Sequence, residues 1–377
     1  MEINIKHTLN MKTYYWILFI LLCAACTKPY RGFVLDGQIS GDAPEILVLS
    51  YQDSLGQNHL DTVAVKNGSF RFRGGINEPT PAMLTTGQPI RSYEDRHYVQ
   101  LWLEPCAMHY QAADSDLQAY SLFGSATNAE AQALNGKLAL IVAKLRDLQA
   151  GGAEEQRLSL RREYNRIQLD FVNSHPDSYI VPGMMRMFAS EMKPDELQGY
   201  YDRWTERVKQ SPAGREIAEE IRKLRAGSPG AEAPLFSATD LNGKTFSLAD
   251  LRGKYVLLDF WATWCKPCRA SNPHLKAIYK KYHAKGLEVV CVSDDDGNPA
   301  LWRKAIEQDG IGAFHHVLRG RKENPRDKSG DISGLYGIHS LPTKFLIDRE
   351  GVIVGRYGGG GDREEQMDAD LKKAFGF

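Results

Sequence analysis

The spacing of apolar and polar residues changes twice along the chain, and each change indicates a different kind of structure. Between residues 33 and 120, short apolar segments such as Ile46–Leu49 alternate with polar, glycine-containing turns. Ser69–Arg73 alternates polar and apolar side chains with a period of two, as expected of a strand with one buried face. This pattern predicts a small antiparallel β domain over residues 30–126.

Residues 127–227 follow a helical pattern instead. Leu134, Leu138 and Ile141 recur at intervals of three and four residues, which places them on one face of a helix. The pattern ends at Gly227–Gly230, whose sequence Gly-Ser-Pro-Gly is typical of a linker. We therefore expect a helical segment between the β domain and the C-terminal part of the chain.

Strand and helix patterns alternate over residues 231–377. Tyr255–Phe260 is a mostly apolar run suited to a buried central strand, and helical patterns follow at Lys266–His283 and Pro299–Asp309. Further strands are expected at 287–292, 343–347 and 352–357, and a last helix at 363–375. Strands covered by helices define the α/β class, so we expect a central mixed sheet covered by helices.

The overall composition excludes several classes of function. The 47 Lys and Arg residues balance 47 Asp and Glu residues, so the formal net charge is zero. The chain therefore lacks the excess of positive charge with which proteins bind nucleic acid or anionic lipid. Its six cysteines are too few for a small disulfide-rich fold, and its 42% hydrophobic residues are typical of packed globular domains.

The N-terminal residues predict export. Tyr14–Ala25 is an apolar run of 12 residues behind Lys12, too short for the ~20 residues that span a bilayer and typical of a signal peptide over 1–25. The run ends in Leu-Cys-Ala-Ala-Cys, which resembles the lipobox of bacterial lipoproteins. We predict lipid attachment at Cys26, with simple signal cleavage as the alternative. The protein is then expected on the periplasmic side of the cell envelope, held to the membrane by the lipid alone.

The strongest chemical signal is Trp261–Cys268, with the sequence Trp-Ala-Thr-Trp-Cys-Lys-Pro-Cys. It follows the predicted central strand and opens a predicted helix. The unpaired N–H groups and partial positive charge of a helix N-terminus favour a thiolate there, and Lys266 adds a full positive charge. The pattern predicts that Cys265 is an exposed nucleophile and that Cys268, one turn further on, is the thiol that resolves its adducts.

Other readings of the cysteines are weaker. A zinc ion on Cys265 and Cys268 would need two more ligands, no second CxxC follows the predicted signal peptide, and His315-His316 lacks metal-ligand spacing, so we predict no metal and no cofactor. Cys291 lies in an apolar segment and is expected to be a small buried hydrophobe. Cys106 is expected to be an unpaired structural thiol, with a regulatory disulfide as the alternative.

The C-terminal part resembles the TlpA/ResA-like branch of the thioredoxin fold, whose members are exported thiol-disulfide oxidoreductases. The matching segments, in chain order, are Ala233–Phe236, Leu241–Lys244, Leu251–Lys254, Trp264–Cys268 and Ser340–Thr343. The resemblance implies a thioredoxin-like fold and an enzyme that exchanges its CxxC with protein thiols and disulfides, as a reductant fed by a membrane electron donor. The N-terminal half is similar to a domain found ahead of such modules in Gram-negative envelope lipoproteins.

The resemblance also implies which residues meet the substrate. Pro342 matches a cis-proline that faces the CxxC, and the residue before it pairs through its backbone with the substrate strand. The residues expected to bind the substrate are Trp264, Lys266, Pro267, Leu341 and Pro342.

Three further positions bear on the chemistry. Asp259, six residues before Cys265, matches the family's buried acid, which relays the proton of the inner thiol; a structural hydrogen bond is the alternative. Ser271 stands where the cytochrome-maturation branch carries Glu, which argues against a dedicated cytochrome c thiol reductant. His339 could face the disulfide and tune the thiolate, or could simply be solvated.

Two other functions stay open. A thiol peroxidase would use a Thr-x-x-Cys arrangement, whereas Thr263 stands only two residues before Cys265. Alternatively, the N-terminal half is an envelope binding module with an appended redox domain, and aromatic residues such as Tyr98 and Trp102 bind its ligand.

Overall fold

The computed structural model describes residues 32–92, 95–149, 154–322, 329–358 and 361–376. The predicted signal peptide 1–25 and the predicted lipid site Cys26 lie outside these residues. Within the described ranges, no helix has both the length and the apolar character needed to cross a bilayer. The chain forms two compact units that divide inside the helical segment: the first runs to Phe171 and includes Ser178–Ile180, and the second holds Val172–Asp177 and everything from Val181.

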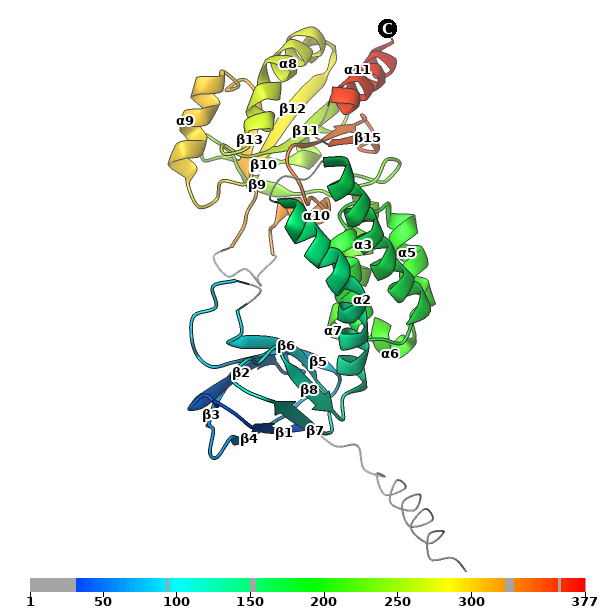
Figure 1. The fold of residues 1–377 in the computed structure, drawn as a ribbon. Coiled ribbons are helices and arrows are strands. Elements are labelled where there is room, and N and C mark those ends of the chain that lie inside the picture. The colour runs from blue at the N-terminus through cyan, green and yellow to red at the C-terminus, as the bar shows by residue number, and fades with distance from the viewer. Residues whose placement is uncertain (1–31, 93–94, 150–153, 323–328, 359–360, 377) are drawn as a thin grey trace, which may run out of the picture. The chain divides into compact units, whose positions relative to one another are not determined.

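The first unit contains two four-stranded sheets (Figure 1). One sheet has the order β4-β1-β7-β8, with β1 (Phe33–Ile39), β4 (Ser69–Gly74), β7 (Ala107–Ala112) and β8 (Tyr120–Phe123). The other has the order β3-β2-β5-β6, with β2 (Ile46–Gln52), β3 (Asn58–Ala64), β5 (Thr80–Thr85) and β6 (Tyr98–Leu103). Leu35, Leu47, Phe72 and Leu84 belong to a single core formed by both sheets.

The predicted antiparallel β domain is confirmed with one exception. β1 pairs in parallel with β7, and the chain between them passes through the other sheet twice, with β4 of the first sheet in between. All other strand pairs of the unit are antiparallel. Tyr98 is buried on β6 and Trp102 is only partly exposed. These two aromatic side chains therefore serve the core more than an open ligand surface.

The helical pattern resolves into six helices among the described residues. They are α2 (Ala126–Gln149), α3 (Glu154–Ser174), α4 (Ile180–Phe188), α5 (Pro194–Arg203), α6 (Glu206–Lys209) and α7 (Pro212–Ala226). Leu134, Leu138 and Ile141 are buried, as the periodicity predicted. The start of α7 is fixed by Ser211, whose Oγ accepts a hydrogen bond from the Gly214 N–H at 3.0 Å.

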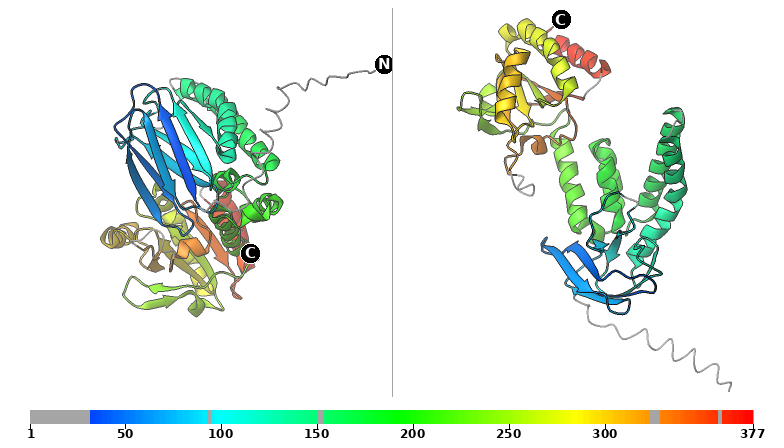
Figure 2. Two further views of the ribbon diagram at one scale, coloured as in Figure 1. Left: turned by 90° about the horizontal axis from the view of Figure 1, so that it is seen from below. Right: turned by 60° about the vertical axis from the view of Figure 1, so that its left-hand side comes forward.

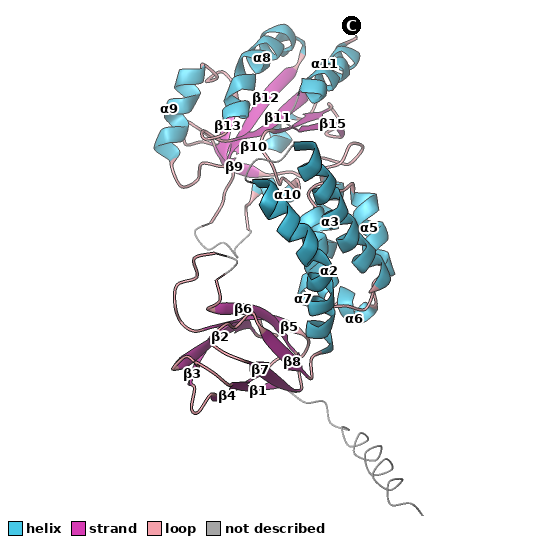
Figure 3. Ribbon diagram, viewed as in Figure 1, coloured by secondary structure: helices cyan, strands magenta, loops and turns pink. Residues whose placement is uncertain are grey.

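The C-terminal part is built on a five-stranded sheet with the order β13-β12-β11-β14-β15 (Figure 3). The strands are β11 (Tyr255–Trp261), β12 (Leu287–Ser293), β13 (His315–Leu318), β14 (Thr343–Ile347) and β15 (Ile353–Gly358). The central strand β11 runs parallel to β12 and antiparallel to β14. The predicted central mixed sheet, and with it the thioredoxin-like α/β fold, is confirmed.

Alternate side chains of β11 point to opposite faces of this sheet. Leu257 and Trp261 join a core completed by α8 (Lys266–Tyr282), α9 (Pro299–Asp309) and α11 (Gly361–Phe375). Leu258 and Phe260 join a second core. The elements on that face are the hairpin β9 (Ser237–Thr239) and β10 (Thr245–Ser247), the 3₁₀ turn η1 (Leu248–Leu251) and α10 (Ile332–Leu335), while η2 (His283–Lys285) follows α8.

The sequence pattern located β11, β12, β14, β15 and the three long helices to within about two residues at each end. It gave no signal for β9, β10, β13 or α10. These elements are three or four residues long, which is too short for a repeating pattern of either period to be recognised. They form only because the sheet and its core supply their partners.

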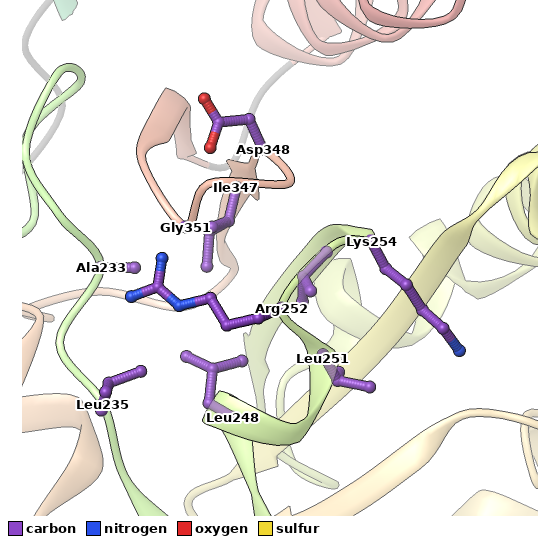
Figure 4. A pocket seen from close by; sticks show the side chains of 10 residues that line it. Ala233, Leu235, Leu248, Leu251, Arg252, Lys254, Ile347, Asp348 and Gly351 are labelled. Atoms are coloured by element: carbon purple, nitrogen blue, oxygen red, sulfur yellow. The ribbon is translucent and has the colours of Figure 1, made fainter.

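A small pocket on the second face lies beside the first residues of β11, whereas the CxxC follows the last ones (Figure 4). Its walls are largely apolar, with Leu235, Leu248 and Leu251 among them. Arg252 crosses it and donates to Glu232 Oε1 at 2.7 Å and to the carbonyl oxygen of Glu350. Arg252 therefore links the segments of Glu232 and Glu350 across this pocket, at the end of the sheet remote from the cysteines.

Candidate active site

The two cysteines of the CxxC lie at the start of α8, as predicted. Cys265 is the N-cap residue, and Cys265 and Cys268 form a disulfide. The Cys268 N–H lies 3.3 Å from Cys265 Sγ and donates to it. This N–H group has no acceptor within the helix, and it acts on the sulfur of Cys265 together with the positive end of the helix dipole. Such an arrangement stabilises a thiolate after reduction.

The expectation that Cys265 is exposed is wrong for this oxidised form. Cys265 is 4% exposed and Cys268 is 2% exposed. Both belong to the core cluster that includes Trp261, and Leu341 packs against the same cluster. Cys265 has this low exposure because its sulfur is bonded to the buried Cys268 and packs within the same core cluster.

The predicted substrate-binding residues divide into two groups. Trp264, Lys266 and Pro267 are exposed around the start of α8, with Trp264 at 65% exposure. Leu341 is partly buried against the cluster that contains the cysteines, and the peptide bond between Leu341 and Pro342 is cis. An exposed indole beside a nucleophile is suited to apolar contact with a partner protein, and these five assignments stay predictions.

Asp259 lies on β11 and is 2% exposed. Burial raises the pKa of its carboxyl group, while the nearby ammonium group of Lys344 opposes that rise. Lys344 Nζ lies 3.3 Å from Asp259 Oδ1, and this oxygen receives no hydrogen bond from the described residues. Asp259 is therefore held in a buried ion pair with Lys344, and the choice between a proton relay and a structural role for it stays a prediction.

Lys344 was missed at the sequence level. It is 4% exposed, on β14, two residues after Pro342. The signal in the sequence was a charged residue inside the apolar run Thr343–Ile347, where every residue is buried. The strand pattern could have indicated a buried ion pair but not its partner, because strand order and register are tertiary properties.

Ser271, noted at the sequence level as a departure from part of the family, lies in the same network. Its Oγ lies 3.2 Å from Lys344 Nζ, which donates to it, and it donates in turn to the carbonyl oxygen of Cys268 at 2.8 Å. Ser271 thus connects the first turn of α8 to the buried ion pair.

A second group missed at the sequence level is Asp295, after the end of β12. Its carboxylate accepts hydrogen bonds from the Thr263 N–H at 2.9 Å and from Thr263 Oγ at 2.6 Å, and also from Ser293 Oγ. Asp295 and Thr263 are both buried. The two bonds from Thr263 fix the segment that leads from β11 into the CxxC, and the bond from Ser293 holds the carboxylate in place.

We expect Asp295→Asn to lower the free energy of unfolding of the oxidised protein by about 1–3 kcal/mol, because an amide nitrogen would face a buried donor of Thr263 or Ser293. Urea denaturation measures this change. Glu307→Gln, at an exposed position of α9, is the matched control and should change the free energy by less than about 0.5 kcal/mol. Equal values for the two variants would contradict this role of Asp295.

His339, Cys291 and Cys106, the other residues considered from the sequence, have structural contacts away from the disulfide. His339 Nε2 lies 2.5 Å from Glu220 Oε1 on α7 and donates a hydrogen bond to it, instead of being simply solvated. Cys291 is buried, and burial raises the pKa of its thiol well above the usual value. Cys106 is a free cysteine whose Sγ donates to the Gly124 carbonyl oxygen at 3.1 Å. Within the described ranges, no three His, Cys, Asp or Glu residues are grouped to hold a metal ion.

Comparison with known proteins yields two family matches. Residues 229–356 match the AhpC/TSA family, and residues 33–131 match a domain of unknown function (DUF4369).

Individual relatives match the C-terminal part. The thiol-disulfide oxidoreductase ResA of Bacillus anthracis is 40% identical over 144 residues, which are 38% of this chain and 77% of that protein. ResA of Bacillus subtilis is 36% identical over 127 residues, 34% of this chain and 65% of that protein. Among solved structures, the thioredoxin domain of a thiol-disulfide oxidoreductase from Bacteroides vulgatus is 34% identical and covers 38% of this chain and 98% of that one, with a TM-score of 0.33.

Proposed function

Since the chain belongs to the ResA family of thiol-disulfide oxidoreductases, we propose that its CxxC reduces disulfide bonds of proteins in the cell envelope. The observation that carries this proposal is the Cys265–Cys268 disulfide at the N-terminus of α8, with a helix N–H donating to Cys265 Sγ. A sulfur that is stabilised as a thiolate beside a second thiol has what dithiol–disulfide exchange requires.

The proposed reaction runs in two displacements. The Cys265 thiolate attacks one sulfur of the substrate disulfide, a bond forms between them, and the other substrate sulfur leaves as a thiolate. Cys268 then loses its proton and attacks Cys265 Sγ, which forms the Cys265–Cys268 disulfide and releases the second substrate sulfur. Two electrons pass to the substrate, which is reduced, and the CxxC is oxidised.

Asp259 is proposed to receive the proton of Cys268. A carboxylate is a good proton acceptor from a thiol when burial brings its pKa closer to that of the thiol. Burial raises the pKa of Asp259 while the ammonium group of Lys344, 3.3 Å from its Oδ1, opposes that rise, and the carboxyl group lies in the sheet that carries the CxxC at its end. The burial of this acid and its raised pKa support the proton relay.

The proposed cellular setting follows from the N-terminal sequence and from the chemistry. A signal peptide over residues 1–25 and a lipid on Cys26 would hold the protein at the periplasmic side of a membrane. Each turnover leaves the CxxC oxidised, in a compartment that favours disulfides. A reductant working there needs electrons from a donor in the membrane, and we propose such a donor as the second partner.

A glutathione redox titration of residues 32–377 tests the reductant role. We expect a reduction potential closer to the roughly −270 mV of thioredoxin than to the roughly −120 mV of the periplasmic oxidant DsbA. The fraction of protein with the Cys265–Cys268 disulfide is measured by alkylating the free thiols and determining the protein mass by mass spectrometry. A potential near −120 mV would leave the exchange chemistry intact but reverse its direction, and a pair that never equilibrates with glutathione would contradict the exchange itself.

A further inference from the structure

The segment that leads into the cis-proline lies against the helical segment as well as against the main sheet. Residues 336–341, called here the cis-proline loop, connect α10 to β14 and end at the cis peptide bond of Pro342. α10 contacts α7, the last helix before the C-terminal part of the chain. The backbone that is expected to pair with a substrate strand is therefore placed beside a helix that covers neither face of the main sheet.

The start of the cis-proline loop is packed directly on the end of α7. Gly337 has a φ of 58°, and a Cβ atom there would lie 3.2 Å from the backbone of Lys223 and of Leu224. A Cβ atom on Gly227, which follows the last residue of α7, would lie 2.4 Å from the carbonyl oxygen of Tyr336. One glycine on each side thus lets the two backbones approach closely.

Arg356 on β15 holds these two backbones together. Its guanidinium group donates to the carbonyl oxygen of Gly337 at 2.8 Å. It also donates to the carbonyl oxygens of Gly227 and Tyr336, each at 3.4 Å. Because a guanidinium group presents its donors in one rigid plane, Arg356 fixes the end of α7 and the start of the loop relative to β15.

A side-chain contact joins the second half of the cis-proline loop to α7. His339 Nε2 donates to Glu220 Oε1 at 2.5 Å, and the two side chains are 34% and 18% exposed. Leu341, two residues further on, packs against both cores of the main sheet. A shift of His339 would therefore be passed through two peptide units to the residue that is expected to pair with the substrate.

We propose that Glu220 is a positioning residue for protein substrates: by holding His339, it keeps the cis-proline loop in the place where the backbone of Leu341 pairs with a substrate strand. The helical segment then contributes to the selection of extended protein segments as substrates. This inference rests on the proposed function. It gives a role to a helix that ends before residue 229, where the match to the AhpC/TSA family begins.

The proposal separates two kinds of disulfide substrate. A disulfide in a protein brings an extended segment whose backbone can add to that of Leu341. A small aromatic disulfide such as dipyridyl disulfide has no peptide backbone, so its reaction depends on the Cys265 thiolate and not on pairing with the loop. A displaced loop should therefore weaken only the reaction with the protein.

The test compares these two reactions in Glu220→Ala. With dithiothreitol as the source of electrons, we expect the KM for insulin to rise about three- to tenfold, as for the loss of one hydrogen bond, while kcat changes by less than about twofold. The rate with dipyridyl disulfide should be unchanged. Glu220→Gln keeps an oxygen that accepts from His339, so it should retain the parent KM to within about twofold.

Glu219→Ala is the matched control. Glu219 is the neighbouring glutamate on α7, but it pairs with Arg222 and Lys223 of its own helix, so both reactions should keep the parent values. His339→Ala breaks the proposed contact from the side of the loop. It should raise the KM for insulin as much as Glu220→Ala does, and the double variant should raise it no further, because both changes remove the same interaction.

Amide hydrogen exchange of residues 337–341, followed by mass spectrometry, reports on the loop without any substrate. We expect it to be at least about threefold faster in Glu220→Ala than in Glu219→Ala, because the loop loses a contact that restrains its opening. If Glu220→Ala does not fold, Glu220→Asp, whose shorter side chain falls short of His339, takes its place in every measurement.

Four results would overturn the positioning role: an unchanged KM for insulin in Glu220→Ala, a rise in His339→Ala alone, an equal loss of rate with dipyridyl disulfide, or unchanged amide exchange. A rise in His339→Ala alone would mean that the histidine itself touches the substrate. Failure of the proposed function would instead appear as an absence of exchange with glutathione in the unmodified protein, and amide exchange would still decide whether α7 holds the loop.

Discussion

Cys265→Ser is expected to abolish disulfide reduction, with turnover falling at least about a thousandfold. A hydroxyl at the start of α8 stays protonated at neutral pH, and the alcohol is a far weaker nucleophile toward sulfur than the thiolate that the helix N-terminus stabilises. A thousandfold loss corresponds to about 4 kcal/mol in the activation free energy. The measurement is the rate of insulin disulfide reduction by the chemically reduced protein and by its variant.

Cys291→Ser is the matched control, since Cys291 is also buried in this sheet but is a free cysteine. It should keep most of the rate. A Cys265→Ser protein that reduces insulin at the parent rate would refute the mechanism. Rapid mixing of the reduced protein with hydrogen peroxide addresses the peroxidase alternative: oxidation at the rate of free cysteine is expected, and a much faster reaction would favour a peroxidase.

Cys268→Ser is expected to accumulate a covalent complex with its substrate. Cys265 can still attack a disulfide, but the thiol that displaces the captured sulfur is missing, so the mixed disulfide should persist at least about a thousandfold longer. A non-reducing gel of the variant after incubation with envelope proteins shows the complex, and mass spectrometry of the cross-linked peptides identifies the joined cysteines and the substrate.

Cys265→Ser/Cys268→Ser serves as the control for this trap and should form no complex. Crosslinks through Cys106, the partly buried free cysteine of the first unit, would show that capture does not depend on the CxxC. If Cys268→Ser formed no adduct while Cys265→Ser kept a phenotype in cells, the N-terminal half would be the functional part instead.

The sequence predicted those parts of the site that are formed by residues close together in the chain. Cys265, Lys266, Pro267 and Cys268 are contiguous, and the strand before them and the helix after them have patterns long enough to recognise. The cis peptide bond before Pro342 was expected from the resemblance of Ser340–Thr343 to a loop of the family. The exposure of Cys265 was not predictable in this way, because it depends on the bond to Cys268 and on a core cluster whose members come from distant parts of the chain.

Contacts between distant residues account for what was missed. Thr263 and Asp295 are joined only because β11 and β12 are parallel neighbours, and Asp259 meets Lys344 only because β14 inserts between β11 and β15. The residues next to each of these four in the sequence are ordinary for a strand or for the end of a strand. Only the register of the strands brings their side chains into contact.

The amino-acid order alone determined that this chain carries a Cys-x-x-Cys pair at the start of a helix, in a fold with a central sheet, because those features are encoded by neighbours a few residues apart. Only the tertiary structure decided that a lysine and an aspartate 85 positions apart share one buried space beneath that helix. The physical reason is that removing two charges from water is costly, and only a close contact between them offsets that cost. Here the pairing of β11 with β14 sets that contact.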